Sequence, residues 1–256
     1  MVTSGTRGAS HLGSSNLVQI TLFVPCFVDA FYPQTAKAMV KIFERLGHTV
    51  KFQQQLTCCG QPPFNAGYWP ESRKVAVKVL DALKDADRVV IPSGSCGAML
   101  KVFYGELFKD TPREAEAHAL RDKTFEFAEF MVKELAVTEL GAKFPHRVTW
   151  HDGCHGLREL GIKDEPRALL AHVEGLELVE MSEAQTCCGF GGLFSAKFPS
   201  ISVAMGEVKT QSASETEANY LISGDGSCLM HIQGVLDRQK RKIKCLHLAE
   251  VLASGW

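Results

Sequence analysis

The chain has 256 residues, of which 45% are hydrophobic and 22% are charged, and its formal net charge at pH 7 is −1. This composition is typical of a globular protein that buries a substantial core, as one large domain or as two fused halves. Because acidic and basic residues are interspersed and nearly balanced, we expect no electrostatic binding to nucleic acid or to an anionic membrane, and we expect neutral or protein partners.

Nine cysteines are present, but the chain is longer than a small secreted domain held together by disulfides. Residues 1–16 are rich in Ser, Gly and Thr and have no apolar stretch like that of a secretory signal peptide. We therefore expect reduced thiols in the cytoplasm and a disordered tail over residues 1–16. Since no apolar run is as long as a membrane span, we also expect a soluble protein with no membrane span.

Apolar periodicity predicts alternating strands and helices in the first part of the chain. Residues 18–24 alternate and then become wholly apolar, which is typical of a buried strand. Ala38, Ile42 and Phe43 recur at helical spacing. Gly47 then marks the helix end. The expected elements are strands at 18–24, 49–52 and 88–91, helices at 35–46 and 71–83, and a loop at 92–97 that leads into a helix at Ala98.

The rest of the chain shows the same alternation after a connecting stretch. Residues 113–137 are predicted to form one long or broken helix that connects the halves. The elements expected after it are strands at 147–150, 176–180, 220–223 and 244–248, helices at 165–173 and 198–212, a loop at 224–228 and a final helical turn. The predicted organisation is a tail over 1–16, a first repeat over 17–112, a connecting helical segment over 113–145 and a second repeat over 146–256.

Eight of the nine cysteines follow a repeated pattern. Each half has a single cysteine, an adjacent pair followed by glycine 32 or 33 residues later, and then another single cysteine. Equivalent cysteines of the two halves are 128, 129 or 132 positions apart, which indicates a duplication. The sets are Cys26, Cys58, Cys59 and Cys96 in the first half, and Cys154, Cys187, Cys188 and Cys228 in the second.

The alternating elements predict an α/β fold of two repeats related by a pseudo-twofold axis, each with a parallel β-sheet flanked by helices. In such a sheet, the loops that leave the carboxyl ends of the strands gather at one edge. Both cysteine sets fall on loops of this kind, so we expect the thiols of each set to meet there. Helix N-termini at that edge favour an anionic guest, and a thiolate-bound iron–sulfur cluster is anionic.

Several roles are open to these thiols. Burial as a small hydrophobic residue suits Cys245, but it does not explain a repeated pattern. Four thiolates could bind zinc, although adjacent side chains diverge and reach two atoms of one iron–sulfur cluster more easily than one metal ion. A vicinal disulfide for thiol exchange would leave the single cysteines unexplained. The glycines beside the pairs permit positive φ and close approach to a bulky cofactor; they are Gly60, Gly189, Gly191 and Gly192.

The motifs resemble those of the cysteine-rich CCG-domain family, whose pattern is a single cysteine, then Cys-Cys-Gly, then Cys-x-x-Cys, usually in tandem. Its members include the B subunit of heterodisulfide reductase and the iron–sulfur subunit of glycolate oxidase. The chain is most similar to the lactate utilisation group of this family, from about residue 18 to its end. The motifs that carry the resemblance are Cys26-Phe27-Val28-Asp29, Cys58-Cys59-Gly60-Gln61-Pro62, Pro92-Ser93-Gly94-Ser95-Cys96, Cys187-Cys188-Gly189-Phe190-Gly191-Gly192 and Ser227-Cys228-Leu229-Met230-His231.

The resemblance implies an iron–sulfur component of a multi-subunit system that oxidises L-lactate to pyruvate, with other protein subunits of that complex as partners. It implies one or two 4Fe-4S clusters bound by the two sets of four thiolates, with zinc possible in one half. The last cysteine of Cys-x-x-Cys is replaced by Met99 and His231, so a fifth thiolate is absent from both halves. Four thiolates suffice for such a cluster, and His231 is either a substitute ligand or bonded to nearby backbone. If only one half carries a cluster, we expect it in the second half, because more glycines follow its cysteine pair and permit close approach to the cluster.

The sequence predicts no catalytic residue. No Gly-x-Gly-x-x-Gly turn follows a strand, so we expect no nucleotide site. Four polar residues surround Cys154, and a carboxylate substrate could use the histidine and arginine among them, although a solvated loop with a hydrogen-bonded histidine is the favoured interpretation; the four are His151, Asp152, His155 and Arg158. The alternative functions are a zinc-stabilised scaffold subunit, an iron–sulfur subunit that acts on glycolate or another 2-hydroxy acid, and a thiol–disulfide oxidoreductase.

Overall fold

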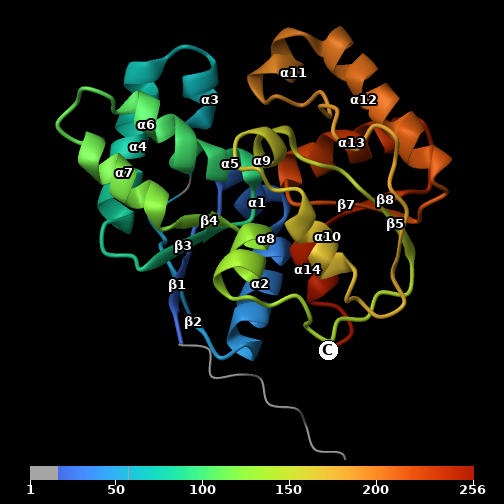
Figure 1. Cartoon of the computed structure of the whole chain (residues 1–256). Helices are drawn as coiled ribbons and strands as arrows, with labels where there is room; N and C mark the ends of the chain where they lie inside the picture. The colour runs from blue at the N-terminus through green and yellow to red at the C-terminus, as the bar shows by residue number, and fades with distance from the viewer. Residues whose placement is uncertain (1–16, 57) are drawn as a thin grey trace, which may run out of the picture.

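A computed structural model describes residues 17–56 and 58–256. The chain forms two halves, each built on a four-stranded, all-parallel β-sheet with helices around it (Figure 1). The predicted α/β fold in two repeats is therefore confirmed. The tail predicted over 1–16 lies outside the described residues.

The two sheets have the same topology. The first has the order β2-β1-β3-β4, and the second has the order β6-β5-β7-β8. The strands are β1 (Gln19–Leu22), β2 (Thr49–Phe52), β3 (Arg88–Ile91), β4 (Thr124–Glu126), β5 (Arg147–Trp150), β6 (Glu177–Leu178), β7 (Tyr220–Ser223) and β8 (Lys244–His247). In the first sheet, Leu22 of β1 is paired with Phe52 on one side and Val90 on the other. The duplication seen in the cysteines thus extends to the whole folding unit.

Strand β4 shows that one prediction is wrong. Residues 113–137 do not form one long or broken helix, because α7 (Glu114–Asp122) ends before β4, and α8 (Phe127–Glu129) begins after it. β4 pairs in parallel with β3, and the N–H of Val89 donates a hydrogen bond of 2.8 Å to the carbonyl oxygen of Lys123. Residues 124–126 therefore pair with the open edge of β3 as a strand, although the apolar spacing around them indicates a helix.

Helices cover both faces of the first sheet. Val90 packs in one core cluster with Ile42 and Phe43, whereas its neighbours Val89 and Ile91 pack in another. This alternation arises because successive side chains of a strand point to opposite faces. Besides α7 and α8, the helices of this half are α1 (Cys26–Phe31), α2 (Pro33–Arg45), α3 (Gln61–Asn65), α4 (Trp69–Leu83), α5 (Gly94–Ala98) and α6 (Tyr104–Leu107), with π-helical turns η1 (Met99–Phe103) and η2 (Phe130–Glu134).

The halves pack against each other through equivalent helices. The second half contains α9 (Cys154–Arg158), α10 (Asp164–Leu170), α11 (Leu193–Lys197), α12 (Pro199–Glu215), α13 (Gly226–Arg238) and α14 (Leu248–Leu252). Helix α2 contacts α14 while α10 contacts α8, and α5 contacts α9 while α1 contacts α13 (Figure 1). Such exchange of equivalent elements is what a twofold relation requires. One core cluster crosses the junction and contains Phe43 and Phe130 together with Trp150 and Leu248.

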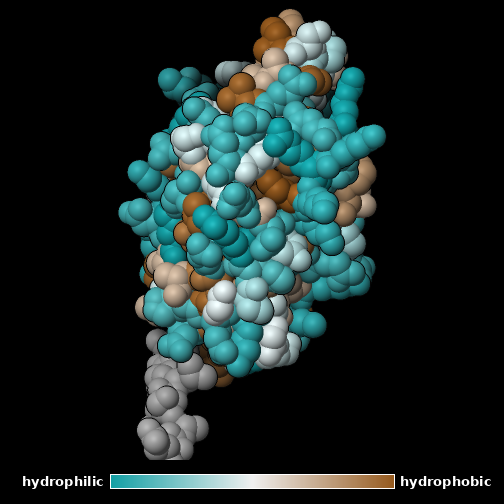
Figure 2. Space-filling model, turned by 90° about the vertical axis from the view of Figure 1, so that its right-hand side faces the viewer, coloured by the Kyte–Doolittle hydropathy of each residue, from teal (hydrophilic) through white to brown (hydrophobic). Residues whose placement is uncertain are grey.

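The surface on the side of the second half is mostly hydrophilic (Figure 2). Hydrophobic atoms gather at its upper end, which is the end where α11 and α12 lie in Figure 1. The exposed large hydrophobic side chains of this segment are Leu193, Phe198, Ile201 and Val208. Across the described ranges, no helix has both the length and the apolar character needed to cross a bilayer.

Candidate metal centre

All eight cysteines of the repeat lie beyond the carboxyl ends of strands. Cys26 begins α1 after β1, and Cys96 lies in the first turn of α5 after β3. The pair Cys58 and Cys59 follows β2 and precedes α3. The corresponding positions in the second half are taken by Cys154 at the start of α9, Cys228 in α13, and the pair Cys187 and Cys188 after β6. The parallel strands therefore deliver each set to one sheet edge, as predicted.

The four single cysteines lie in first helical turns rather than in loops, which corrects the sequence prediction. Ser93 caps α5, where its Oγ accepts a hydrogen bond from the N–H of Cys96 at 3.4 Å. Asp225 caps α13, where its carboxylate accepts the N–H of Ser227 at 3.3 Å. Short polar residues are favoured at this position because they satisfy N–H groups that lack partners within the helix. These two caps fix the first turns from which Cys96 and Cys228 project. Helices α1 and α9, which carry Cys26 and Cys154, follow Pro25 and Gly153 and have no side-chain cap.

The four thiols of the first half form a connected chain of contacts. Cys58 interacts through its sulfur with Cys26 and Cys59, and the Sγ atoms of Cys59 and Cys96 are 3.2 Å apart. The N–H of Gly60 donates to Cys58 Sγ at 3.4 Å. Hydrogen bonding with Cys26 lowers the pKa of Cys58 well below its usual range and raises the pKa of Cys26. One sulfur of the set therefore carries a negative charge that its neighbours stabilise.

The second half repeats these contacts. Cys187 interacts with Cys154 and Cys188, and Cys188 interacts in turn with Cys228. The N–H of Gly189 donates to Cys187 Sγ at 3.4 Å. Hydrogen bonding with Cys154 lowers the pKa of Cys187, while the same contact raises the pKa of Cys154. The two sets are thus alike in connectivity and in the position of the thiolate.

Both sets line the same cavity between the halves. Its volume is about 140 Å³. Phe27 and Phe190, one from each half, meet at this cavity with their ring centroids 5.5 Å apart. The sequence predicted where each set gathers, but not that the two sets face one space. The twofold relation between the halves brings the carboxyl edges of the two sheets together.

Asp225 is a buried carboxylate that lines the cavity with both sets, and its role could not be predicted from the sequence. Its Oδ2 accepts the N–H of Ser95 at 2.9 Å and the hydroxyl of Ser93 at 3.4 Å, both from the other half. Its Oδ1 accepts the hydroxyl of Ser227 at 2.7 Å. One side chain therefore ties together the first turns of α5 and α13, which carry a cysteine each.

A second buried acid, Glu126, ends β4 and lines the same small cavity as Asp225. Glu126 caps α8, and its Oε2 accepts the N–H groups of Ala128 at 2.7 Å and Glu129 at 3.3 Å. Burial raises the pKa of Glu126 from 4.5 to about 8, and the charges of Glu129 and Asp225 act in the same direction. The folded chain therefore holds a proton that the unfolded chain releases above about pH 4.5.

We expect this carboxyl to make the free energy of unfolding fall as the pH rises from about 4.5 to about 8. The sign follows because the native state binds more protons than the unfolded state in that range. Replacing Glu126 with glutamine should flatten the decline by roughly 4 kcal/mol, measured by urea unfolding at a series of pH values. The exposed Glu139→Gln variant is the control; equal pH slopes in the two variants would contradict the assignment.

Glycine follows each cysteine pair for a packing reason. Gly60 and Gly189 have φ angles of +85° and +93°. A Cβ on Gly189 would lie 2.5 Å from the carbonyl oxygen of Ser202 in α12. The predicted positive φ is confirmed, but these two glycines approach helix backbone rather than the cavity. Gly191 and Gly192, which also have positive φ, do line the cavity.

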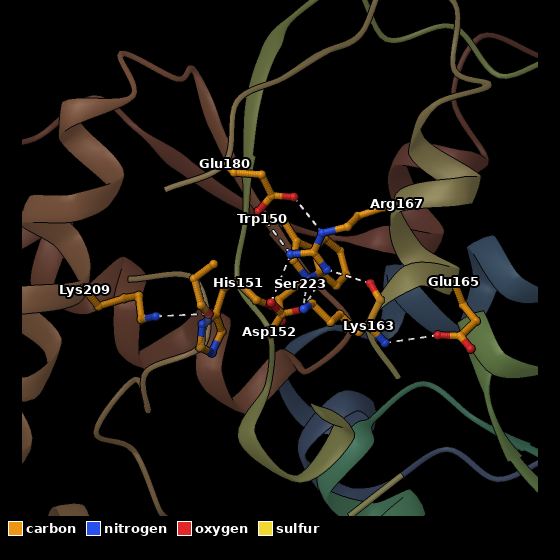
Figure 3. Close-up of polar contacts among 10 residues, drawn as sticks. Trp150, His151, Asp152, Lys163, Glu165, Arg167, Glu180, Lys209 and Ser223 are labelled. Atoms are coloured by element: carbon orange, nitrogen blue, oxygen red, sulfur yellow. Dashed lines mark hydrogen bonds and ion pairs between the residues drawn. The ribbon is translucent and has the colours of Figure 1, made fainter. Parts of the chain in front are cut away.

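The segment at the end of β5 is buried, which corrects the expectation of a solvated loop. His151 and Asp152 are both buried. Asp152 accepts the guanidinium of Arg167 at 2.9 and 3.0 Å and the indole N–H of Trp150 at 2.7 Å (Figure 3). Arg158 is exposed on α9, so the histidine and arginine suggested for carboxylate binding lie in different environments.

A histidine and a lysine lie behind the second thiol set. A ring nitrogen of His151 and the sulfurs of Cys188 and Cys228 all lie within 4.8 Å of one another. Burial, and then the charge of Lys209, lowers the pKa of His151 to about 3, so the imidazole is neutral. Lys209 donates to the carbonyl oxygen of Ala184 at 3.3 Å (Figure 3), and burial lowers its pKa to about 8. The burial of Lys209 could not be predicted from the sequence, because a lysine in a helix is usually solvated.

Two other candidates from the sequence do not line the cavity. Nε2 of His231 lies 3.2 Å from the carbonyl oxygen of Ser202, which agrees with the interpretation as a backbone-bonded histidine. Cys245 lies in β8 opposite Leu221 and packs against a core cluster of the second half. Burial raises the pKa of its thiol. A packing role suits Cys245.

The donor atoms fit a thiolate-bound metal group. Each set offers four sulfurs already in contact, held by two helix first turns and one cysteine pair. Sulfur ligands select iron–sulfur clusters or zinc over magnesium and calcium, which bind oxygen. In the second half an imidazole nitrogen, that of His151, also lies within 4.8 Å of two of the candidate sulfur ligands.

Comparison with known proteins agrees with this geometry. The sequence profile of the cysteine-rich domain family, CCG, matches residues 20–101 and 148–233. Lactate utilization protein A of Geobacillus kaustophilus is 47% identical over 92% of this chain and 98% of its own length. The chain belongs to the lactate utilization protein A family of CCG-domain proteins. The protein of the same name from Bacillus thuringiensis is 43% identical over 93% of this chain and 99% of its own.

The family match covers the site completely, since the two matched segments contain all eight cysteines of the repeat. They stop short of β4 and β8, the strands that complete each sheet. The crystal structure of a hypothetical protein from Helicobacter pylori has a TM-score of 0.61 over 93% of this chain and 49% of that one, at 11% sequence identity. That likeness concerns the fold alone.

Proposed function

We propose that the chain is an iron–sulfur component of a multi-subunit system that oxidises L-lactate to pyruvate. The observation that carries this proposal is that eight thiols in two equivalent sets line one cavity in a relative of lactate utilization protein A. In the proposal, Cys26, Cys58, Cys59 and Cys96 hold one 4Fe-4S cluster, and Cys154, Cys187, Cys188 and Cys228 hold a second. A bound cluster supplies one-electron transfer.

The arrangement of the thiols supports a cluster over a single ion in each set. Adjacent cysteines such as Cys58 and Cys59 point their sulfurs in different directions along the chain of contacts, with Cys26 on one side and Cys96 on the other. Four sulfurs spread in this way suit the several irons of a cluster. A common cavity also places the two sets close enough for electrons to pass between them without a further carrier.

Partner subunits are part of the proposal, because lactate oxidation removes two electrons and a hydrogen acceptor must be supplied. The sequence has no Gly-x-Gly-x-x-Gly turn after a strand, so we assign nucleotide binding to another subunit. Leu193 lines the cavity and is exposed, and it continues into the exposed hydrophobic side chains of Phe198 and Ile201. Exposed apolar patches of this kind mark protein contacts.

A zinc site in the second half is the second candidate, because His151 stands beside Cys188 and Cys228. Two sulfurs and an imidazole are common zinc ligands. In that case, the chain would be a metal-stabilised scaffold subunit with at most one cluster.

Anaerobic purification followed by iron, sulfide and zinc analysis tests the proposal. We expect about eight irons and eight sulfides per chain, and a paramagnetic resonance signal after reduction. Zinc at one per half without iron would exclude electron transfer. Turnover of disulfides by metal-free protein would instead favour a thiol–disulfide oxidoreductase. Growth of a gene-deletion strain on L-lactate and on glycolate then separates the two substrates; normal growth on L-lactate would count against lactate.

A further inference from the structure

We propose that His151 and Lys209 make the second thiol set electronically unlike the first, so that a cluster bound by the second set has the higher reduction potential. His151 places an N–H donor next to the sulfurs of Cys188 and Cys228, and Lys209 places a positive charge near the same sulfurs. This inference rests on the proposed function. It assigns a direction to electron flow within the chain, from the first set to the second.

His151 is held rigidly against the sulfurs. The residue is 0% exposed, and its backbone N–H donates to the carbonyl oxygen of Ile222 at 2.9 Å, while its own carbonyl accepts the hydroxyl of Ser223 at 2.9 Å. Neither ring nitrogen has a hydrogen-bond partner within the part of the chain that the structure describes. An unpartnered buried imidazole is costly, and the thiol sulfurs of Cys188 and Cys228, within 4.8 Å, are available to accept its N–H.

Lys209 brings a charge to the same place. Its side chain is buried, and its ammonium group donates to the backbone carbonyls of Glu183 and Ala184. Among the residues that the structure covers, it forms no ion pair with a carboxylate. Its positive charge acts on the sulfurs of Cys188 and Cys228 more than on the carboxylates of Glu183 and Asp152, which also lie within electrostatic reach.

The position of His151 is taken by Phe23 in the first half. The two residues are equivalent, because the N–H of Phe23 donates to the carbonyl oxygen of Val90 at 3.0 Å, as the N–H of His151 does to that of Ile222 at 2.9 Å. Both side chains are fully buried. The first thiol set therefore faces a phenyl ring where the second faces an imidazole.

The position of Lys209 is taken by Val79. Ser72 in α4 donates its hydroxyl to the carbonyl oxygen of Gly60 at 2.8 Å, and Ser202 in α12 donates to that of Gly189 at 2.8 Å, so these serines are equivalent. Val79 and Lys209 both stand about two helical turns after their serine. Two apolar residues, Phe23 and Val79, thus stand at the first set in the positions that the nitrogen donors His151 and Lys209 occupy at the second.

The physical consequence concerns the added electron. Reduction makes an already anionic cluster more negative, and both N–H hydrogen bonds to sulfur and a nearby positive charge stabilise that extra charge. When the first cluster gives one electron to the second, the first is oxidised by one electron, the second is reduced by one, and no proton has to move. Four thiolates already satisfy a cluster, so His151 acts as a donor beside it rather than as a ligand.

Potentiometric titration of the reconstituted full chain, followed by paramagnetic resonance, tests the inference. We expect two one-electron steps in the unaltered chain. Replacing His151 with phenylalanine, which copies Phe23, or Lys209 with methionine should lower only the higher potential. A tenfold loss of the reduced form at a fixed potential corresponds to about 59 mV. The matched control is Phe23→Leu, an apolar change at the equivalent position, which should move neither step.

The outcomes separate this inference from the function on which it rests. Iron in both sets with one common potential, or with potentials that neither variant moves, overturns the inference and leaves the proposed function standing. Strong nitrogen coupling in pulsed resonance, or loss of iron from the second set in the His151→Phe chain, shows ligation and overturns it as well. A chain that binds zinc and no iron overturns both proposals.

Discussion

Replacement of Cys188 by serine is expected to reduce the iron and sulfide bound per chain by about half. Cys188 is buried between Cys187 and Cys228, so its loss breaks the connected set at its centre. The first set lies in the other half and keeps all its contacts, so the remaining iron should have the spectrum of that set alone. Replacement of Cys59 by serine is expected to remove the iron of the first set and to leave the iron of the second set.

The measurement is metal analysis of anaerobically reconstituted protein, with paramagnetic resonance to assign the remaining cluster. Cys245→Ser is the matched control, because this thiol lies in β8 away from the cavity, and the variant should bind the full amount. The chain with both Cys59 and Cys188 replaced should bind none. If either single variant loses all its iron, the eight thiols hold one shared assembly, and the assignment of one cluster to each half is wrong.

The strands and the placement of the cysteines could be predicted from local sequence. β1, β3 and their counterparts β5 and β7 are short runs whose last three residues are buried, ended by polar or glycine-rich segments, and that pattern depends on neighbouring residues only. A cysteine directly after such a run must lie at the carboxyl edge of a parallel sheet. The repeated spacing then gave the two sets without knowledge of how the halves pack.

The features that local sequence could not reveal depend on distant contacts. β4 has three residues and exists because β3 has an open edge, while Phe125, Phe127 and Phe130 around it suggest a helix. Asp152 is buried because Arg167 and Trp150 satisfy it, and neither contact has a signature in the sequence.

The cavity that both thiol sets line could not be predicted from the sequence for the same reason. The sequence repeat implies a twofold relation, but many arrangements of two equivalent sheets would satisfy it. The observed arrangement is selected by the helix pairs at the junction, such as α5 with α9 and α1 with α13, whose first turns carry the single cysteines. The same helix pairs therefore join the halves and position the thiols. Replacing a residue that couples the halves should affect both thiol sets.

Asp225 is a side chain that couples the halves directly beside two of the single cysteines. Its carboxylate accepts hydrogen bonds from Ser95 and Ser93 across the junction and from Ser227 in its own half. Hydrogen bonds to a charged group contribute more than neutral ones, and removal of the acceptor leaves the half-buried N–H of Ser95 without this partner. We therefore expect Asp225→Ala to lower the free energy of unfolding by about 3 kcal/mol or more.

The variant should also bind less iron in both sets, because the first turns that carry Cys96 and Cys228 lose a common anchor. Urea unfolding under anaerobic reducing conditions gives the stability, and metal analysis gives the binding. Ser227→Ala is the matched control: it removes the hydrogen bond that Asp225 accepts within its own half, leaves the bonds from Ser93 and Ser95 across the junction in place, and should cost about 1 kcal/mol. If Asp225→Ala is no more destabilising than Ser227→Ala, the carboxylate does not join the halves.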